Sequence, residues 1–251
     1  MSLPASLINR PVTHRALHNR AAGRVENSPS AIRAAIDGGW GIEIDVQLTS
    51  DARAMVFHDD QLDRLTGETG PVRAHSAQRL TQITLSGGAD GIPTLPEVLK
   101  MVAGQVPLMI EIKDQDGALG PNIGPLEAAV AENLKGYSGE VAVMSFNPHS
   151  VAAFAALAPG IPRGLVTSAF DPVFWPGVPV ATCDRLRDMP DFDCVGAQFI
   201  SHEVADLANP AVLALKARGV PILCWTVRSA AVEMEARKIA DNVTFEEYIP
   251  A

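Results

Sequence analysis

Two carboxylates lie two residues apart in the stretch GIEIDVQL, residues 41–48. Apolar and polar residues alternate strictly along it, which predicts a β-strand because successive side chains of a strand point to opposite faces. Glu43 and Asp45 therefore share one face, where two like charges repel each other unless a cation lies between them. Taken alone, the pattern also fits an edge strand with one face in water.

Three more predicted strands carry polar side chains at or near their C-terminal ends. These are His14 and Arg15 (residues 10–15), His58 and Asp59 (residues 54–59), and Glu111 and Lys113 (residues 107–113). The last two are again two residues apart, so they too share a face. Separately, each pair has a simple structural explanation: a surface position, an ordinary turn and a cross-strand ion pair, in that order.

Together, these side chains indicate a metal-assisted phosphoester site. Three carboxylates in one low-dielectric site repel one another, and a divalent cation removes that repulsion. A ligand set made only of oxygen atoms favours Mg²⁺ or Ca²⁺ over zinc. Arg15 and Lys113 beside such a metal could hold a phosphate, and the two histidines could act as general base and general acid.

The elements that would position this site alternate between strands and helices. Besides the four strands above, we predict strands at residues 140–146, 163–167, 194–200, 220–227 and 241–245, and helices at 29–37, 95–103, 125–135, 148–157, 209–217 and 230–238. Such alternation implies βαβ units and a parallel sheet. About eight units fit a (β/α)₈ TIM barrel, in which the chemistry lies at the C-terminal ends of the strands. A doubly wound open sheet is the alternative.

One region breaks this rhythm and is predicted to be an insertion. Residues 60–92 are rich in Gly, Thr and Ser, which indicates an inserted loop region after the second βα unit. The sequence contains no internal repeat, low-complexity tract or linker, so residues 1–251 are predicted to form a single domain. Hydrophobic residues make up 47% of the chain and charged residues 20%, as is ordinary for a globular protein.

Charge and cysteine content limit the partners and the compartment. A formal net charge of −9 argues against nucleic acid, which needs clustered Lys and Arg. The N-terminus lacks a secretory signal and no uncharged apolar run approaches about 18 residues, so we expect no stable membrane insertion. The spacing of Cys183, Cys194 and Cys224 matches no zinc site and suits reduced, mostly buried thiols in a cytoplasmic protein. A homo-oligomer is compatible with the sequence.

The order and spacing of these motifs resemble the glycerophosphodiester phosphodiesterase family. The resemblance rests on His14-Arg15, on Glu26–Ser28 (ENS), and on residues 41–51 (GIEIDVQLTSD), 56–72 (VFHDDQLDRLTGETGPV), 92–99 (IPTLPEVL) and 110–113 (IEIK), and it resumes at 224–227 (CWTV). Residues 120–220 match only through their barrel-like rhythm.

The resemblance implies a fold, a reaction and a role for each site residue. It implies a (β/α)₈ barrel with a small insertion, a role in glycerol and lipid metabolism, and a small phosphodiester substrate that yields an alcohol and sn-glycerol 3-phosphate. It implies that Glu43, Asp45 and Glu111 hold Mg²⁺ or Ca²⁺, that His14 and His58 are the acid–base pair, that Arg15 and Lys113 bind phosphate, that Trp225 contacts the glycerol or alcohol group, and that Glu26 and Asn27 lie near the site. Plain structural roles remain open for Trp225, Glu26 and Asn27, as do the choice of acid and base and a cyclic phosphate intermediate.

The sequence departs from the family pattern at three places. Ala16 stands where the family usually has Gly, and Leu65 replaces a usual Thr. Residues 240–250 (ADNVTFEEYIP) lack the usual Gly before the last strand and the Thr-Asp pair after it. None of these departures falls on a proposed metal ligand or histidine, but they leave the identity of the substrate open.

Two other functions are compatible with the same residues. A lysophospholipase D or a sugar-phosphodiester hydrolase would need an apolar groove or a sugar pocket, for which the candidate lining residues are Phe146, Phe170, Phe174 and Trp175. The apolar, Pro-rich loop 170–179 could be a lid, a substrate wall or a subunit contact. A barrel that has lost catalysis is the remote alternative, and it would lack a histidine or carboxylate that this chain retains.

Overall fold

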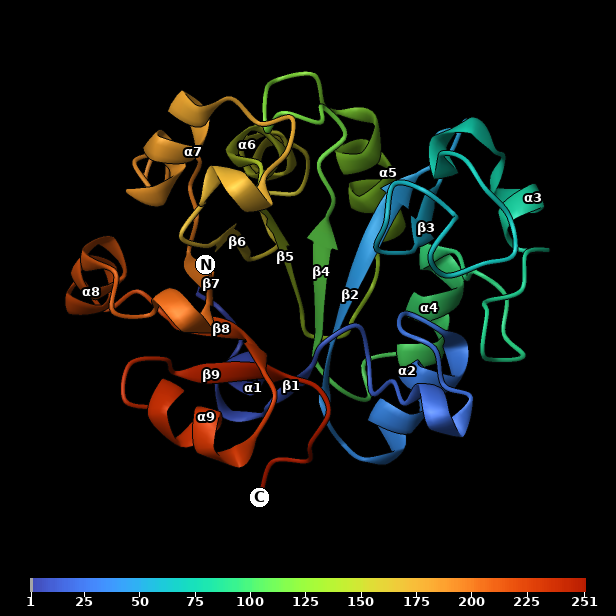
Figure 1. Ribbon diagram of the computed structural model, residues 1–251, viewed down its shortest axis with the longest axis horizontal. Helices are drawn as coiled ribbons and strands as arrows, with labels where there is room; N and C mark the ends of the chain where they lie inside the picture. The colour runs from blue at the N-terminus through green and yellow to red at the C-terminus, as the bar shows by residue number, and fades with distance from the viewer. Residues whose placement is uncertain (1) are drawn as a thin grey trace.

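The chain, which the computed structural model describes over residues 2–251, forms a closed ring of parallel strands (Figure 1). In order around the ring, the eight strands are β1 (Val12–Thr13), β2 (Gly41–Leu48), β4 (Leu108–Ile112), β5 (Val141–Ser145), β6 (Arg163–Thr167), β7 (Phe199–Glu203), β8 (Ile222–Val227) and β9 (Asn242–Phe245). β1 pairs with both β2 and β9, and these pairings close the sheet on itself. The predicted (β/α)₈ barrel is confirmed.

Helices fill the connections between the strands and lie outside the ring (Figure 1). They are α2 (Pro29–Asp37), α4 (Leu95–Val102), α5 (Pro125–Asn133), α6 (Pro148–Leu157), α7 (Val180–Arg187), α8 (Pro210–Ala217) and α9 (Ala230–Ala236). The predicted bounds of α2 and α6 are confirmed residue for residue. In α2, the Ser28 hydroxyl accepts a hydrogen bond from the Ala31 amide at 3.2 Å, and Pro29 occupies the first turn, where it needs no backbone donor.

Two of the predicted strands differ from the structure by more than two residues at one or both ends. The strand predicted at residues 54–59 is β3 (Ala54–Val56), which pairs antiparallel with β2 and lies outside the ring. The short connection from β2 allows only this arrangement, because a parallel crossover needs a dozen or more residues. β7 begins at Phe199 instead of residue 194, because the preceding residues form turns in which the Val195 amide donates to the Asp191 carbonyl at 3.0 Å. We also did not predict α7.

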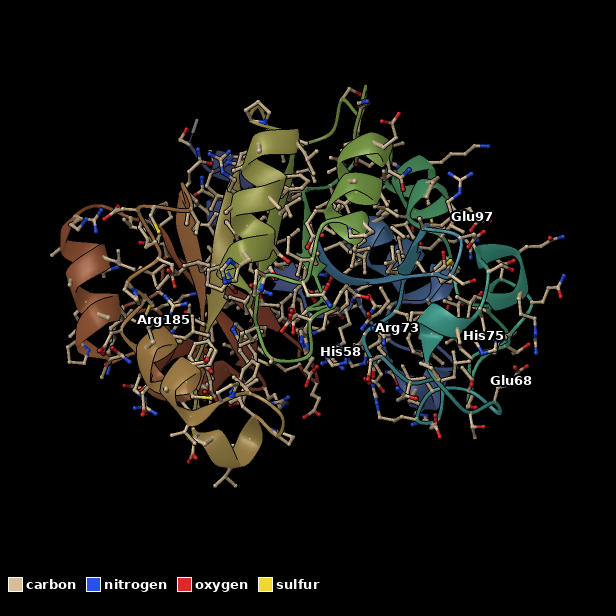
Figure 2. All side chains as sticks on the ribbon, turned by 90° about the horizontal axis from the view of Figure 1, so that it is seen from above. His58, Glu68, Arg73, His75, Glu97 and Arg185 are labelled. Carbon is tan, nitrogen blue, oxygen red and sulfur yellow. The ribbon has the colours of Figure 1, made fainter. Side chains whose placement is uncertain are left out.

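The predicted insertion follows the β2–β3 hairpin and precedes α4. Residues 60–92 contain the short helix α3 (Ala77–Leu80) and are otherwise turns and bends. Their Leu62, Leu65 and Leu80 belong to a small apolar core that also takes in Met55 and Phe57 of the preceding hairpin. Leu65 is 2% exposed, so the leucine that departs from the family pattern serves packing. Figure 2 shows Glu68, Arg73 and His75 together on this side of the molecule, with Arg185 on the opposite side.

Apolar side chains close the N-terminal end of the barrel. The N-terminal helix α1 (Ala5–Asn9) was not predicted, and its Leu7 packs with Met109 and Leu223 from inside the ring. Asn242 fixes this helix, because its amide group donates to the carbonyl oxygens of Leu7 at 2.9 Å and Arg10 at 2.6 Å. The opposite end of the barrel is therefore the end that can hold a site.

Two other sequence predictions concern membranes and thiols. Across residues 2–251, no helix has the length and apolar composition that a membrane crossing requires. All three cysteines are free thiols, of which Cys183 and Cys224 are buried and Cys194 is exposed. The single-domain organisation of residues 1–251 stays a prediction.

Candidate active site

Three carboxylates converge at the C-terminal ends of two neighbouring strands. Asp45 on β2 lies directly beside Glu111 on β4 in the strand register, and Glu43 shares the inward face because it is two residues away. The three side chains each offer an oxygen atom within 4.8 Å of the other two. Glu43 and Asp45 are each 2% exposed, and Glu111 is 7% exposed. The sequence therefore predicted this cluster correctly.

The cluster carries more negative charge than its surroundings neutralise. Burial and the neighbouring charges of Asp45 and Glu111 raise the pKa of Glu43 well above its usual range. Burial also opposes ionisation of Asp45, but the positive charges of His58, Lys113 and Arg15 outweigh it and lower the pKa of Asp45. The raised pKa of Glu43 beside the ionised Asp45 means that the site holds too little positive charge to ionise every carboxylate, so an added cation would stabilise it.

Lys113 contributes one of the two cationic groups beside the carboxylates. The Lys113 Nζ atom donates to Glu111 Oε1 at 2.7 Å and lies 3.4 Å from Asp45 Oδ1. Burial alone would lower the pKa of Lys113, but the charges of Glu111 and Asp45 outweigh it, so the pKa of Lys113 is raised. Lys113 is therefore a permanent cation in this site.

Arg15 contributes the other cationic group, through its backbone and its side chain. Its amide donates to Glu43 Oε2 at 2.7 Å, and its Nη1 donates to Glu26 Oε1 at 2.7 Å. Its Nε lies 3.7 Å from Asp45 Oδ2 and is buried without a hydrogen-bond acceptor among residues 2–251. A buried N–H group without an acceptor is rare, so this Nε is a candidate donor to a bound anion.

A turn in the left-handed region places Arg15 over the carboxylates. The φ angles of Arg15 and Ala16 are 52° and 64°, which explains why a Gly is usual at the second position. Here the Ala16 methyl group is 1% exposed and packs in the barrel's outer core, and the Ala16 amide donates to the Glu43 carbonyl at 2.9 Å. The departure at Ala16 therefore preserves the contact between the turn and β2.

Glu26 and Asn27 lie behind the first layer of side chains. Asn27 Nδ2 donates to Asp45 Oδ2 at 2.9 Å, and the Asp45 amide donates back to Asn27 Oδ1 at 3.3 Å. Asn27 has a φ of 58°, which Asn tolerates better than most residues. Glu26 accepts hydrogen bonds from Arg15 and Arg64, and these bonds outweigh its burial and lower its pKa to about 2. The structure thus brings both predicted residues against the site.

Each of the two predicted histidines has its Nδ1 atom against a carboxylate. His14 Nδ1 lies 2.6 Å from Glu246 Oε2, and His58 Nδ1 lies 2.6 Å from Asp59 Oδ1. A carboxylate acceptor at Nδ1 favours the tautomer with its proton there, which leaves Nε2 free to exchange a proton. Burial lowers the pKa of His14, and Glu246 only partly offsets this.

The antiparallel strand β3 brings His58 to the site. Because β3 runs back along β2, the amide of Phe57 donates to the Asp45 carbonyl at 3.0 Å. Gln47 Nε2 then donates to the His58 carbonyl at 2.9 Å. His58 consequently lies next to the carboxylates although its strand is not part of the ring, and Figure 2 shows it between the insertion and the opposite half of the barrel.

The two histidines, the three clustered carboxylates and the two cationic groups face one cavity of about 460 Å³, which has a polar and an apolar side. The polar side has the predicted His14, Arg15, Glu43, Asp45, His58, Glu111 and Lys113, and the apolar side includes Leu119, Phe146, Trp175 and Trp225. The Phe146 ring lies 4.9 Å from the Trp175 ring and 5.5 Å from the Trp225 ring, between centroids. Of the other predicted lining residues, Phe170 is buried behind this wall and Phe174 is 77% exposed, so neither lines the cavity.

The family model described as the glycerophosphoryl diester phosphodiesterase family matches residues 14–247, which include every site residue above. The chain belongs to this family. The residues named by the sequence resemblance thus meet in a barrel of the expected family.

Individual relatives agree with this membership. YhdW of Bacillus subtilis, which carries a provisional name as a glycerophosphodiester phosphodiesterase, is 27% identical over 239 residues, covering 90% of this chain and 92% of YhdW. The glycerophosphodiester phosphodiesterase of Bacillus altitudinis is 34% identical over 151 residues, covering 57% of this chain and 61% of that protein. The structure of an Oleispira antarctica phosphodiesterase, in complex with the product sn-glycerol-3-phosphate, matches with a TM-score of 0.77 at 24% identity, over 97% and 95% of the two chains.

Two residues that surround the site of this family member, Glu246 and Arg64, were not predicted from the sequence. Glu246 accepts hydrogen bonds from Arg228 and from His14, and lies 3.3 Å from His18 Nε2. No departure falls on a histidine, but Glu246 of the departing segment 240–250 contacts His14, so this segment shapes the surroundings of that histidine. The sequence offered one hint of this role, because Glu246 lies close to the position where the family usually has its Thr-Asp pair.

Arg64 of the insertion is the other missed residue. It donates two hydrogen bonds to Glu26, at 2.9 and 2.8 Å, and two to Asp59, at 2.6 and 2.9 Å. Arg64 thereby joins the carboxylate behind Arg15 to the carboxylate that holds His58. Its place within the matching stretch 56–72 was the available signal, but nothing in the sequence indicates its two partners.

Proposed function

We propose that this chain hydrolyses glycerophosphodiesters to an alcohol and sn-glycerol 3-phosphate. Family membership supports phosphodiester hydrolysis, and the Oleispira antarctica phosphodiesterase is described with that product bound. The observation that carries the proposal is the pair of histidines: each has Nδ1 against a carboxylate, and both face one cavity with three carboxylates and two cations.

Glu43, Asp45 and Glu111 would hold a divalent cation. The fit rests on their buried oxygen atoms within 4.8 Å of one another and on the raised pKa of Glu43, which marks uncompensated charge. Carboxylate oxygens are hard ligands, which favour Mg²⁺ or Ca²⁺. When bound, such a cation would offset negative charge on the phosphodiester oxygens. Asn27 would keep Asp45 oriented through its two hydrogen bonds.

Arg15 and Lys113 would bind the phosphodiester. Lys113 Nζ already lies within 3.4 Å of both Glu111 and Asp45, so it would place positive charge next to an entering phosphate. The buried Nε of Arg15 would gain an acceptor from a phosphate oxygen. Glu26 would keep the Arg15 guanidinium in place at the other end, through the 2.7 Å hydrogen bond to Nη1.

His14 and His58 would move the two protons of the reaction. Because the lowered pKa of His14 leaves its imidazole neutral near pH 7, its Nε2 suits the general base that takes a proton from the nucleophile. His58 would then give a proton to the oxygen of the leaving alcohol. The nucleophile is water, or the substrate's own glycerol 2-hydroxyl, in which case water opens a cyclic phosphate in a second step.

Single substitutions test the histidine roles. We expect His14→Ala and His58→Ala each to lower kcat at least about a hundredfold, as is usual for loss of a general acid or base, with an unchanged circular dichroism spectrum. His149→Ala is the matched control, because His149 is an exposed residue of α6. Turnover near wild type in either site variant would contradict the acid–base assignment.

A lysophospholipase D is the second candidate, favoured by the apolar wall of the cavity. Trp175 and Trp225 each make an edge-to-face contact with Phe146 there. Val173, two residues before Trp175, is 80% exposed. An acyl chain could lie along such a surface. Release of choline from lysophosphatidylcholine faster than from glycerophosphocholine, in matched assays, would favour this substrate, and the reverse order would favour the water-soluble diesters.

A further inference from the structure

The histidine at the end of β1 belongs to a second cluster of metal-ligating side chains. His14, His18 and Glu246 come from the end of β1, the loop after it and the end of β9, and each offers a ligand atom within 4.8 Å of the other two. We infer that these three residues form an inhibitory zinc site, separate from the carboxylate cluster.

Glu246 is the carboxylate that lies close to both imidazoles, so a small separation of His14 Nδ1 from Glu246 Oε2 would make room for an ion. Glu246 Oε2 lies 2.6 Å from His14 Nδ1 and 3.3 Å from His18 Nε2. Arg228 donates to the other oxygen, Oε1, at 2.7 Å, and this hydrogen bond keeps Oε2 turned toward the two imidazoles. Part of the Arg228 charge is offset by Glu247, whose Oε1 lies 3.9 Å from Arg228 Nε.

The donor set differs in kind from the carboxylate cluster. Two imidazole nitrogens and one carboxylate oxygen are a common ligand set for Zn²⁺ in proteins, with the fourth position left to water. Three carboxylates instead suit a hard cation. The two clusters therefore prefer different metal ions. His14 links them, because it belongs to the second cluster and also lines the catalytic cavity.

Solvent can reach the His18 side of this second site through a separate hollow, whereas His14 lines the catalytic cavity. The side chains of His14, His18 and Glu246 are 14%, 22% and 11% exposed. His18 lines this hollow, which has a volume of about 520 Å³, together with Arg24, Glu247 and Tyr248. A zinc ion could enter through that hollow while substrate occupies the main cavity.

Zinc bound there would stop His14 from exchanging protons. The ion would bind the lone pair of Nδ1, and the single proton of the neutral imidazole, now donated to Glu246, would pass through solvent to Nε2. With a proton on Nε2, His14 could not accept another from a nucleophile, and giving it up would leave an unfavourable imidazolate. This inhibitory effect rests on the proposed role of His14, but binding does not.

Zinc stoichiometry tests the site without using activity. We would compare wild type, His18→Ala and the control His149→Ala, each stripped with EDTA and dialysed against ZnCl₂, and repeat all three with Glu43→Gln to weaken the carboxylate cluster. In that background we expect one tightly bound zinc per chain, lost in His18→Ala and kept in His149→Ala. Equal zinc content and affinity with and without His18 would overturn the proposal.

Inhibition of turnover tests the consequence. The assay would use saturating Mg²⁺, with the rate of each variant normalised to its own rate without zinc. We expect His18→Ala to need at least about tenfold more zinc for half inhibition than wild type. The reason is that loss of a metal ligand lowers metal affinity at least as much as loss of its supporting contacts. The same zinc concentration for half inhibition in wild type and His18→Ala would refute the inhibitory role. Failure of wild type to turn over any diester would contradict the proposed function alone, because the stoichiometry would still decide the zinc site.

Discussion

The contact between Glu246 and His14 offers a sharp test of how the site is positioned. Glu246→Gln keeps the shape of the side chain and an oxygen that can accept the hydrogen bond from His14 Nδ1, now made at 2.6 Å, but removes its charge. Hydrogen bonds from His14 and His18 and the charges of His14 and Arg228 outweigh burial and lower the pKa of Glu246, so the wild-type residue is ionised at pH 7. The substitution therefore removes one full charge from beside the proposed base.

The expected loss follows from the strength of the two kinds of hydrogen bond. A bond to a charged group contributes about 1.5–3 kcal/mol, and one between neutral groups about 0.5–1.5 kcal/mol. The difference, about 1–1.5 kcal/mol, applies most when His14 becomes an imidazolium in the transition state. We therefore expect kcat to fall about tenfold, with a smaller change in KM, because Glu246 does not line the catalytic cavity.

A pH–rate profile separates this role from a general loss of structure. Glu246 raises the pKa of His14 against the effect of burial, so without its charge the pKa of His14 falls further, and the limb of the profile that reports His14 moves to lower pH. Glu247→Gln is the matched control, since Glu247 is the next residue and its side chain is 64% exposed. Wild-type kcat and an unmoved limb in Glu246→Gln would refute the positioning role.

Three further substitutions test the surrounding contacts. Arg64→Ala should lower kcat about fivefold, because about 1 kcal/mol is lost from its ion pairs with Asp59 and Glu26. Arg79→Ala, which breaks an ion pair within the same insertion, should not lower kcat. Equal kcat values in the two variants would contradict this role of Arg64. Glu26→Gln should lower the free energy of unfolding by up to about 3 kcal/mol at pH 7. Because the pKa of about 2 in the folded state lies below the ordinary value of 4.5 for a glutamate, that difference should vanish in urea titrations as the pH falls from 4.5 to about 2. A difference independent of pH would refute the charge argument. Glu43→Gln should raise the Mg²⁺ concentration for half activity at least about tenfold, unlike Glu140→Gln on the surface, and an unchanged titration would exclude Glu43 as a ligand.

Local patterns predicted the parts of the site that depend on one strand or turn. The bounds of β2 were predicted residue for residue, and strict alternation alone placed Glu43 and Asp45 on one face. Glu111 on β4 and Lys113 directly after it followed from the same rule. His58 was placed correctly although its strand was not, because a hairpin partner of β2 also ends next to Asp45.

Contacts between distant segments could not be predicted in the same way. His14 and Glu246 are separated by 232 positions, and only closure of the ring by β1 and β9 brings them together. Arg64 lies in an insertion whose turns carry no periodic pattern, so its pairing with Glu26, 38 positions away, depends on how that insertion folds back. The exposure of Phe174 likewise depends on tertiary packing that the apolar loop sequence does not specify.

Release of sn-glycerol 3-phosphate is the measurement that tests the central claim most directly. Purified protein would be given glycerophosphocholine, glycerophosphoethanolamine, glycerophosphoglycerol and glycerophosphoinositol, each with Mg²⁺, with Ca²⁺ and with EDTA. We predict release from at least one diester that depends on the divalent cation, stops in EDTA and is lost in His14→Ala and His58→Ala. Release that persists in EDTA, or no release from any of the four diesters with either cation, would contradict the proposed function.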